Sequence, residues 1–127
     1  MITIVKATLA CDAGRIISAD GVSNQLEGGA VQAASWTLTE RVQMEPHGII
    51  SEDWESYQVL RFSDSFPIRT ILLDRPDQRP LGCGEAVQGP MAAAIGNAVF
   101  AATGIRLRDL PMTPERVLQA RNDISTN

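Results

Sequence analysis

The stretch from Gly82 to Thr103 constrains the fold of this 127-residue chain more than any other segment. Small residues dominate its second half, namely Ala92, Ala93, Ala94, Gly96, Ala98, Ala101 and Ala102. Alanine is the strongest helix former, Pro90 suits a first helical turn, and Gly104 suits the residue that ends a helix. The segment therefore predicts a helix over about 90–103 that packs very closely on a partner.

A second helix is predicted from about residue 20 to 40, with Asp20 as the N-cap. Its apolar residues recur at helical spacing on more than one side, which predicts that it is mostly buried; they are Val22, Leu26, Ala30, Val31, Ala33, Ala34 and Leu38. The pair Gly28-Gly29 costs this helix about 1 kcal/mol per glycine relative to alanine. Such a pair marks the close approach of a neighbouring backbone or a ligand.

The remaining segments predict strands, a hairpin and a short helix. Residues 2–11 and 66–74 are expected strands, the second at least half buried on both faces. Segments 41–44 and 49–51 flank a turn with an exposed His47 and form an expected hairpin, and Thr113 is the expected N-cap of a short helix. The fold class is α+β, with a small mixed or antiparallel sheet packed against two main helices. One domain, 1–127, is expected, ending in a frayed tail over 119–127.

Composition excludes several classes of protein. The net charge is −4, Lys6 is the single lysine and the arginines are scattered, so nucleic acid is not an expected partner. No apolar run reaches the roughly 20 residues that span a bilayer, and residues 1–6 do not resemble a secretory signal, so a cytoplasmic location is expected. Cys11 and Cys83 lie far apart without a CxxC spacing, which indicates buried or incidental thiols and no metal ligands.

Glu85 is the residue of greatest chemical interest. It stands in Gly82-Cys83-Gly84-Glu85, just before a predicted helix, where a carboxylate is either a general base or a group that interacts with the helix N-terminus. Local spacing favours the second interpretation, because no nucleophile, metal cluster or second acid is adjacent. Gln25 and Glu27 are polar groups on a largely apolar helix, expected to be exposed or bonded to a nearby loop. No phosphate-binding loop pattern is present.

Six motifs taken together extend this interpretation. In order along the chain they are Asp12-Ala13-Gly14-Arg15, Asn24-Gln25-Leu26-Glu27-Gly28-Gly29, Ser56-Tyr57-Gln58-Val59-Leu60-Arg61, Gly82-Cys83-Gly84-Glu85, Ala98-Val99-Phe100-Ala101-Ala102-Thr103-Gly104 and Leu107-Arg108-Asp109-Leu110-Pro111. Over residues 2–118 the chain resembles the C-terminal part of the molybdopterin-binding large subunit of the xanthine dehydrogenase/aldehyde oxidase family. The resemblance is greatest to the isoquinoline 1-oxidoreductase and aldehyde dehydrogenase branch.

The resemblance implies roles for four of the motif glycines and for two polar residues. Glu85 would be the catalytic base beside molybdenum, in a hydroxylation of an aldehyde or N-heterocycle that uses water-derived oxygen. Gln25 would contact the pterin, and Gly28, Gly29, Gly82 and Gly84 would let the backbone approach the cofactor. The implied cofactor is molybdenum–molybdopterin dinucleotide, and the implied partners are the rest of the molybdopterin-binding region and an iron–sulfur subunit.

Family large subunits are several times longer than this chain, and most of their cofactor-binding loops lie upstream of the matched part. The isolated chain is therefore expected to bind no cofactor and to be inactive alone. The alternative is a non-catalytic, truncated or stand-alone domain that folds, and oligomerises to cover exposed apolar surface, without molybdenum cofactor.

Overall fold

The fold consists of a parallel strand pair, two long helices against one of its faces, and a third helix beyond them. The computed structural model describes residues 2–125. In chain order its elements are β1 (Ala7–Asp12), α1 (Ala19–Leu38), β2 (Met44–Glu45), β3 (Gly48–Ile49), a 3-10 turn (Phe62–Asp64), β4 (Ile68–Leu73), α2 (Gln88–Thr103) and α3 (Pro114–Ser125). Helices and strands thus both occur in one chain, and the predicted α+β class is confirmed.

Strands β1 and β4 pair in parallel, in a register that runs from Ala7 opposite Ile68 to Asp12 opposite Leu73. Parallel neighbours cannot be joined by a hairpin, so the chain returns through α1 before it enters β4. Strands β2 and β3 pair antiparallel and form a separate short hairpin, which is the one antiparallel pair within residues 2–125. The prediction of a mixed or antiparallel sheet against the helices therefore needs correction, because that sheet is a parallel pair.

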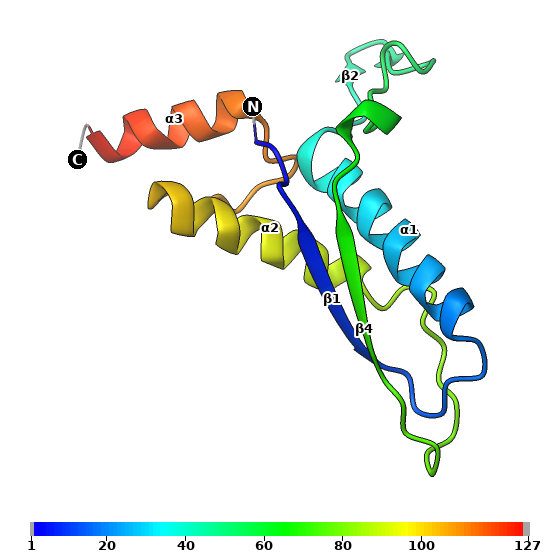
Figure 1. Ribbon diagram of the computed structural model, residues 1–127. Coiled ribbons are helices and arrows are strands. Elements are labelled where there is room, and N and C mark those ends of the chain that lie inside the picture. The colour runs from blue at the N-terminus through cyan, green and yellow to red at the C-terminus, as the bar shows by residue number, and fades with distance from the viewer. Residues whose placement is uncertain (1, 126–127) are drawn as a thin grey trace.

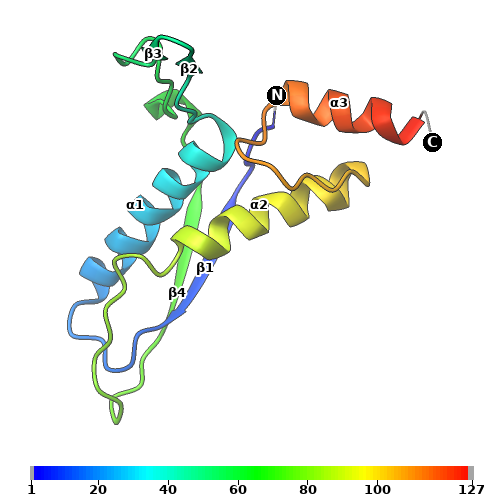
Figure 2. The same cartoon turned by 180° about the vertical axis from the view of Figure 1, so that it is seen from behind.

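Only one face of this strand pair is covered by the described residues. Ala7, Leu9, Cys11, Ile68, Thr70 and Leu72 are partly buried, and the residues between them are exposed. The two helices lie behind the strands in Figure 1 and in front of them in Figure 2, so the opposite face is open. On that open face Ile71 and Leu73 are 40% and 42% exposed, so the prediction that both faces of 66–74 are at least half buried holds for these two side chains.

Helix α1 begins slightly earlier than expected. Ser18, with extended backbone, is the N-cap, and its Oγ accepts the Gly21 N–H at 3.2 Å. Asp20 therefore lies inside the first turn, where a carboxylate still interacts favourably with the helix dipole. The helix ends at Leu38, close to its expected end.

The core is the contact between α1 and α2. Leu26, Ala30, Ala33 and Ala34 of α1 are fully buried, and they form one cluster with Val87, Met91, Ile95 and Val99 from the α2 side. Gly29 is buried in this contact, and a Cβ atom placed on it would lie 2.8 Å from Val87 Cγ2. The absence of a side chain at Gly29 is therefore what lets Val87 seat against α1.

The C-terminal segment packs on the far ends of both helices. Gly104 ends α2 with φ at 73°, as its position in the sequence predicts. The Met112 N–H donates to the Thr37 carbonyl of α1 at 2.6 Å, and Met112 Cε lies 3.0 Å from where a Cβ on Gly96 would be. The Thr113 Oγ1 accepts the Arg116 N–H at 3.4 Å, in the expected position for an N-cap.

Helix α3 continues to Ser125, so most of the segment that was expected to fray is helical; Thr126 and Asn127 lie outside the described residues. The bounds 1–127 of a single domain remain an expectation.

The two neighbouring glycines of α1 provide a matched test of this packing. A Cβ on Gly28 meets nothing within 4 Å, so Gly28→Ala should raise the free energy of unfolding by up to about 1 kcal/mol through helix propensity alone. Gly29→Ala should instead lower it, because overpacking against Val87 costs about 1–3 kcal/mol. Urea denaturation of both variants measures the difference. Adding Val87→Ala to Gly29→Ala should restore part of the loss; equal stability of the two single variants would contradict the close contact.

Candidate functional site

The loop before α2 holds Glu85 in a defined turn. The Ala86 N–H donates to the Cys83 carbonyl at 3.3 Å, and the Gln88 N–H donates to the Glu85 carbonyl at 3.2 Å. Buried Val87 follows directly and fixes this turn against Gly29 of α1. The Glu85 side chain itself is exposed, so its carboxylate is available to a bound group.

Gln25 lies beside this loop. Its Nε2 atom is 3.4 Å from where a Cβ on Gly84 would be, so the amide lies at contact distance from position 84. Gln25 and Glu85 are both exposed. The fold thus brings the Gln25 motif of α1 next to the glycine–glutamate loop, although the two motifs are far apart in the sequence.

The four predicted cofactor-binding glycines fall into two kinds. A Cβ on Gly29 would overlap Val87, and a Cβ on Gly84 would touch the Gln25 amide. Gly28 and Gly82 are open, with no other atom within 4 Å of where their Cβ atoms would be. At Gly29 and Gly84, another part of the described chain already approaches the glycine. At Gly28 and Gly82, the space next to the glycine is free for a ligand or another polypeptide.

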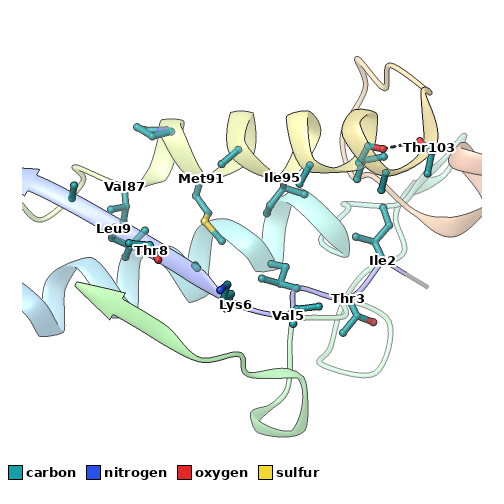
Figure 3. A pocket seen from close by; sticks show the side chains of 18 of the residues that line it. Ile2, Thr3, Val5, Lys6, Thr8, Leu9, Val87, Met91, Ile95 and Thr103 are labelled. Atoms are coloured by element: carbon teal, nitrogen blue, oxygen red, sulfur yellow. Dashed lines mark hydrogen bonds between the residues drawn. The ribbon is translucent and has the colours of Figure 1, made fainter. Parts of the chain in front are cut away.

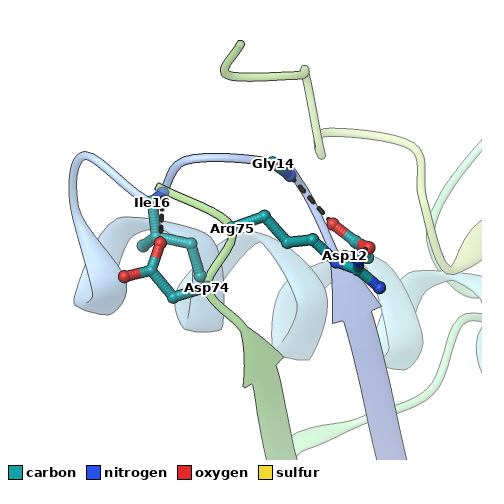
Figure 4. A network of polar contacts seen from close by, with 5 residues as sticks. All are labelled: Asp12, Gly14, Ile16, Asp74 and Arg75. Atoms are coloured by element: carbon teal, nitrogen blue, oxygen red, sulfur yellow. Dashed lines mark hydrogen bonds and ion pairs between the residues drawn. The ribbon is translucent and has the colours of Figure 1, made fainter. Parts of the chain in front are cut away.

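The loops at the carboxyl ends of β1 and β4 form a polar network next to this site (Figure 4). The Asp12 carboxylate forms an ion pair with Arg75 at 2.8 Å and accepts the Gly14 N–H at 3.1 Å. The Asp74 carboxylate accepts the Ile16 N–H at 3.2 Å. In addition, the Leu81 N–H donates to the Ala13 carbonyl at 2.9 Å. These contacts hold the 74–81 loop, which leads to Gly82, against the end of β1.

The Asp12–Arg15 motif forms a turn at the end of β1, as its residues indicate. An Asp two residues before a Gly often forms a turn in which the Asp carboxylate accepts the backbone N–H of the Gly. Gly14 has φ at 68°, and a Cβ there would collide with the Arg79 carbonyl. Gly14 is thus the position that lets the 74–81 loop approach the end of β1.

Cys11 and Cys83 are both free and partly buried. Burial raises the pKa of the Cys11 thiol above its ordinary value of 9.0, and the nearby Cys83 and Asp12 charges raise it further. Cys11 is therefore a neutral thiol at physiological pH, and its partial burial agrees with the expectation of a buried or incidental thiol.

The side chains at this site could transfer a proton and bind the polar edge of a ligand. Glu85 supplies an exposed carboxylate, Gln25 supplies an amide that can donate and accept, and the glycines leave backbone accessible. Within residues 2–125 there is no group of three or more His, Cys, Asp or Glu side chains that could hold a metal ion. Among the described helices, none has the length and apolarity to cross a membrane.

Comparison with known proteins identifies the class. Residues 1–66 match the molybdopterin cofactor-binding domain family. The chain is 39% identical over 119 residues to a nicotinate dehydrogenase polypeptide of Pseudomonas putida, a match that covers 94% of this chain and 10% of that protein. It is 34% identical to the beta chain of isoquinoline 1-oxidoreductase from Brevundimonas diminuta, over 89% of this chain and 14% of that protein.

The crystal structure of quinoline 2-oxidoreductase from Pseudomonas putida 86 superposes with a TM-score of 0.73 at 26% identity, covering 89% of this chain and 15% of that one. The chain belongs to the molybdopterin cofactor-binding domain family, and the resemblance to large subunits of the xanthine dehydrogenase/aldehyde oxidase family is confirmed. It spans 10% to 15% of the length of these relatives.

The ionisation of Cys11 gives a test of the packing around this site. Because its pKa is higher in the folded chain than in the unfolded chain, the pH midpoint of its alkylation should lie above that measured in urea. For the same reason, Cys11 should reduce the free energy of unfolding as pH rises above about 9. Iodoacetamide labelling followed by peptide mass spectrometry separates Cys11 from Cys83. Coincident midpoints in buffer and urea would contradict the burial of the Cys11 thiol.

Proposed function

We propose that this chain forms the C-terminal portion of a molybdenum hydroxylase, in which Glu85 is the catalytic base and Gln25 contacts the pterin cofactor. The observation that carries the proposal is the position of the Gln25 amide against Gly84, immediately before the exposed Glu85. Two motifs that the family resemblance links to one cofactor are therefore adjacent, on elements fixed by the Gly29–Val87 contact.

The residues present suit a molybdenum–pterin group. The pterin has polar ring edges that an amide such as Gln25 can bind, and the glycines at positions 28 and 82 leave space for a large planar ligand. An exposed carboxylate on a short, anchored turn is suited to proton transfer. When bound, the cofactor supplies the two-electron oxidation chemistry, and the protein supplies binding, orientation and proton transfer.

In this mechanism the Glu85 carboxylate accepts a proton from the water-derived nucleophile at one of its Oε atoms, and the nucleophile then attacks an electrophilic carbon of the substrate. Gln25 orients the cofactor edge, and Val87 keeps the Glu85 turn in register with α1. Because Glu85 is exposed in the described residues, the walls that exclude water would come from the rest of the large subunit.

The proposal includes further partners. The rest of the molybdopterin-binding region would complete the cofactor site, and an iron–sulfur subunit would carry the electrons away. The similarity to nicotinate dehydrogenase and isoquinoline 1-oxidoreductase supports an N-heterocycle as substrate, and the family resemblance also implies aldehydes as a substrate class. The chain by itself would then bind no cofactor and catalyse no turnover.

Replacing Glu85 tests the catalytic role. In a chimera that carries this chain in place of the matching segment of the Pseudomonas putida polypeptide, Glu85→Gln should lower kcat by at least about 100-fold, the loss typical of a missing general base. Cofactor content should be unchanged, since the amide keeps the size of the side chain. Glu52→Gln, at an exposed position in the loop after β3, is the matched control and should retain activity. Turnover by Glu85→Gln at the parent rate would rule the role out.

Replacing Gln25 tests the cofactor contact independently of turnover. In the same chimera, Gln25→Ala should lower the molybdenum and pterin content per polypeptide, because the amide contact to the cofactor edge is lost. Metal analysis and mass spectrometry of the released pterin measure this, with the exposed Gln58→Ala as the control. A Gln25→Ala protein with full cofactor content would contradict the contact. A parent chimera that takes up no cofactor in a competent host would favour the non-catalytic alternative.

A further inference from the structure

An apolar groove of about 780 Å³ runs between β1 and α2 (Figure 3). One wall is the continuous segment 2–10, which includes the first part of β1, and the other is formed by α2 residues such as Met91 and Ile95. The labelled side chains of Met91 and Ile95 point from α2 toward the β1 segment. Val5, in the middle of the first wall, is 81% exposed, so the groove is open to a large partner.

The β1 wall is a free strand edge. The Ala7 N–H donates to the Pro67 carbonyl at 3.0 Å, so residues 7, 9 and 11 direct their backbone groups toward β4. The backbone N–H and C=O groups of Thr8 and Ala10, which alternate with them, point the other way. Among the described residues β1 pairs with β4 alone, so these groups form a row of unpaired donors and acceptors.

The α2 wall of the groove suits the packing of a strand on a helix. Pro90, Ala94, Ala98 and Ala102 all line the groove and recur every four residues, so they form one row of small side chains along α2. Figures 1 and 2 both show α2 extending to the side of β1 away from β4. Helix α2 therefore already underlies the position that a strand next to β1 would take.

We propose that this groove receives an extended segment from the rest of the molybdenum hydroxylase large subunit, which pairs with the free edge of β1 and packs apolar side chains on α2. The proposal rests on the proposed function. The relatives are far longer than this chain, which covers 10% to 15% of them, and the fold is retained inside the long chain of the quinoline 2-oxidoreductase. A parallel sheet is normally covered on both faces, and the described residues cover only one face of this strand pair.

A second copy of the chain fits this groove less well. In a symmetric dimer, the β1 strands of two copies would pair antiparallel across a two-fold axis perpendicular to the sheet. The α2 helices of both copies would then lie in the same layer, under the two paired β1 strands. Each α2 would then occupy the space that the other needs. A segment without its own helix in that layer avoids the collision.

The experiment co-expresses this chain with the matched nicotinate dehydrogenase polypeptide of Pseudomonas putida lacking its corresponding 119 residues, and measures co-purification and affinity. The two parts should associate. Ala94→Arg and Ala98→Arg should weaken association at least about tenfold, because a charge would be buried without a partner. Ala93→Arg and Ala101→Arg, at exposed α2 positions outside the groove, are the matched controls and should associate normally.

Hydrogen exchange with single-residue resolution tests the strand pairing itself. The Thr8 and Ala10 amides should exchange rapidly in the free chain and be protected in the complex, whereas the Leu9 amide, directed at β4, should change little. No association, equal weakening by the groove and control variants, or a homodimer that protects Thr8 and Ala10 would each overturn the proposal. A Glu85→Gln complex that assembles and still turns over would remove the proposed catalytic role and leave the docking intact.

Discussion

The contact between Gly29 and Val87 is the constraint on which the rest of this structure depends. It allows α1 and α2 to approach so closely that a single methyl group at position 29 would collide with Val87. Because Val87 directly follows the Glu85 turn, this contact also fixes that turn relative to Gln25. Core packing and site geometry therefore depend on the same few atoms.

The parallel strand pair places the polar network and the groove in different parts of the molecule. The carboxyl ends of β1 and β4 carry the loops in which Asp12, Gly14 and Arg75 hold the segment that leads to Gly82 (Figure 4). The opposite edge of β1, together with α2, forms the apolar groove. Helix α2 connects the two, since its N-terminal end carries the Glu85 turn and its length forms one wall of the groove.

Local chemistry predicted the elements well where a residue's own conformation decides the outcome. Gly104 ends α2 because glycine adopts a left-handed conformation at little cost, and the alanine run forms the helix that it favours. The N-cap of α1 was misplaced because Ser18 and Asp20 are both capping residues, and only the backbone conformation at Ser18 selects between them. The alternation of Ile71 and Leu73 with other apolar residues predicts burial of β4, but it does not say which neighbour covers each face.

The sequence by itself determined the α+β class, the approximate helix extents, the family resemblance and the choice of Gln25 and Glu85 as candidates. The tertiary structure alone decided that the strands pair in parallel, that Gln25 lies against Gly84, and that Gly29 is tight while Gly28 is open. The difference is physical. Propensities and caps act between residues close in sequence, whereas strand direction and the contacts of a glycine depend on which distant segment packs against it.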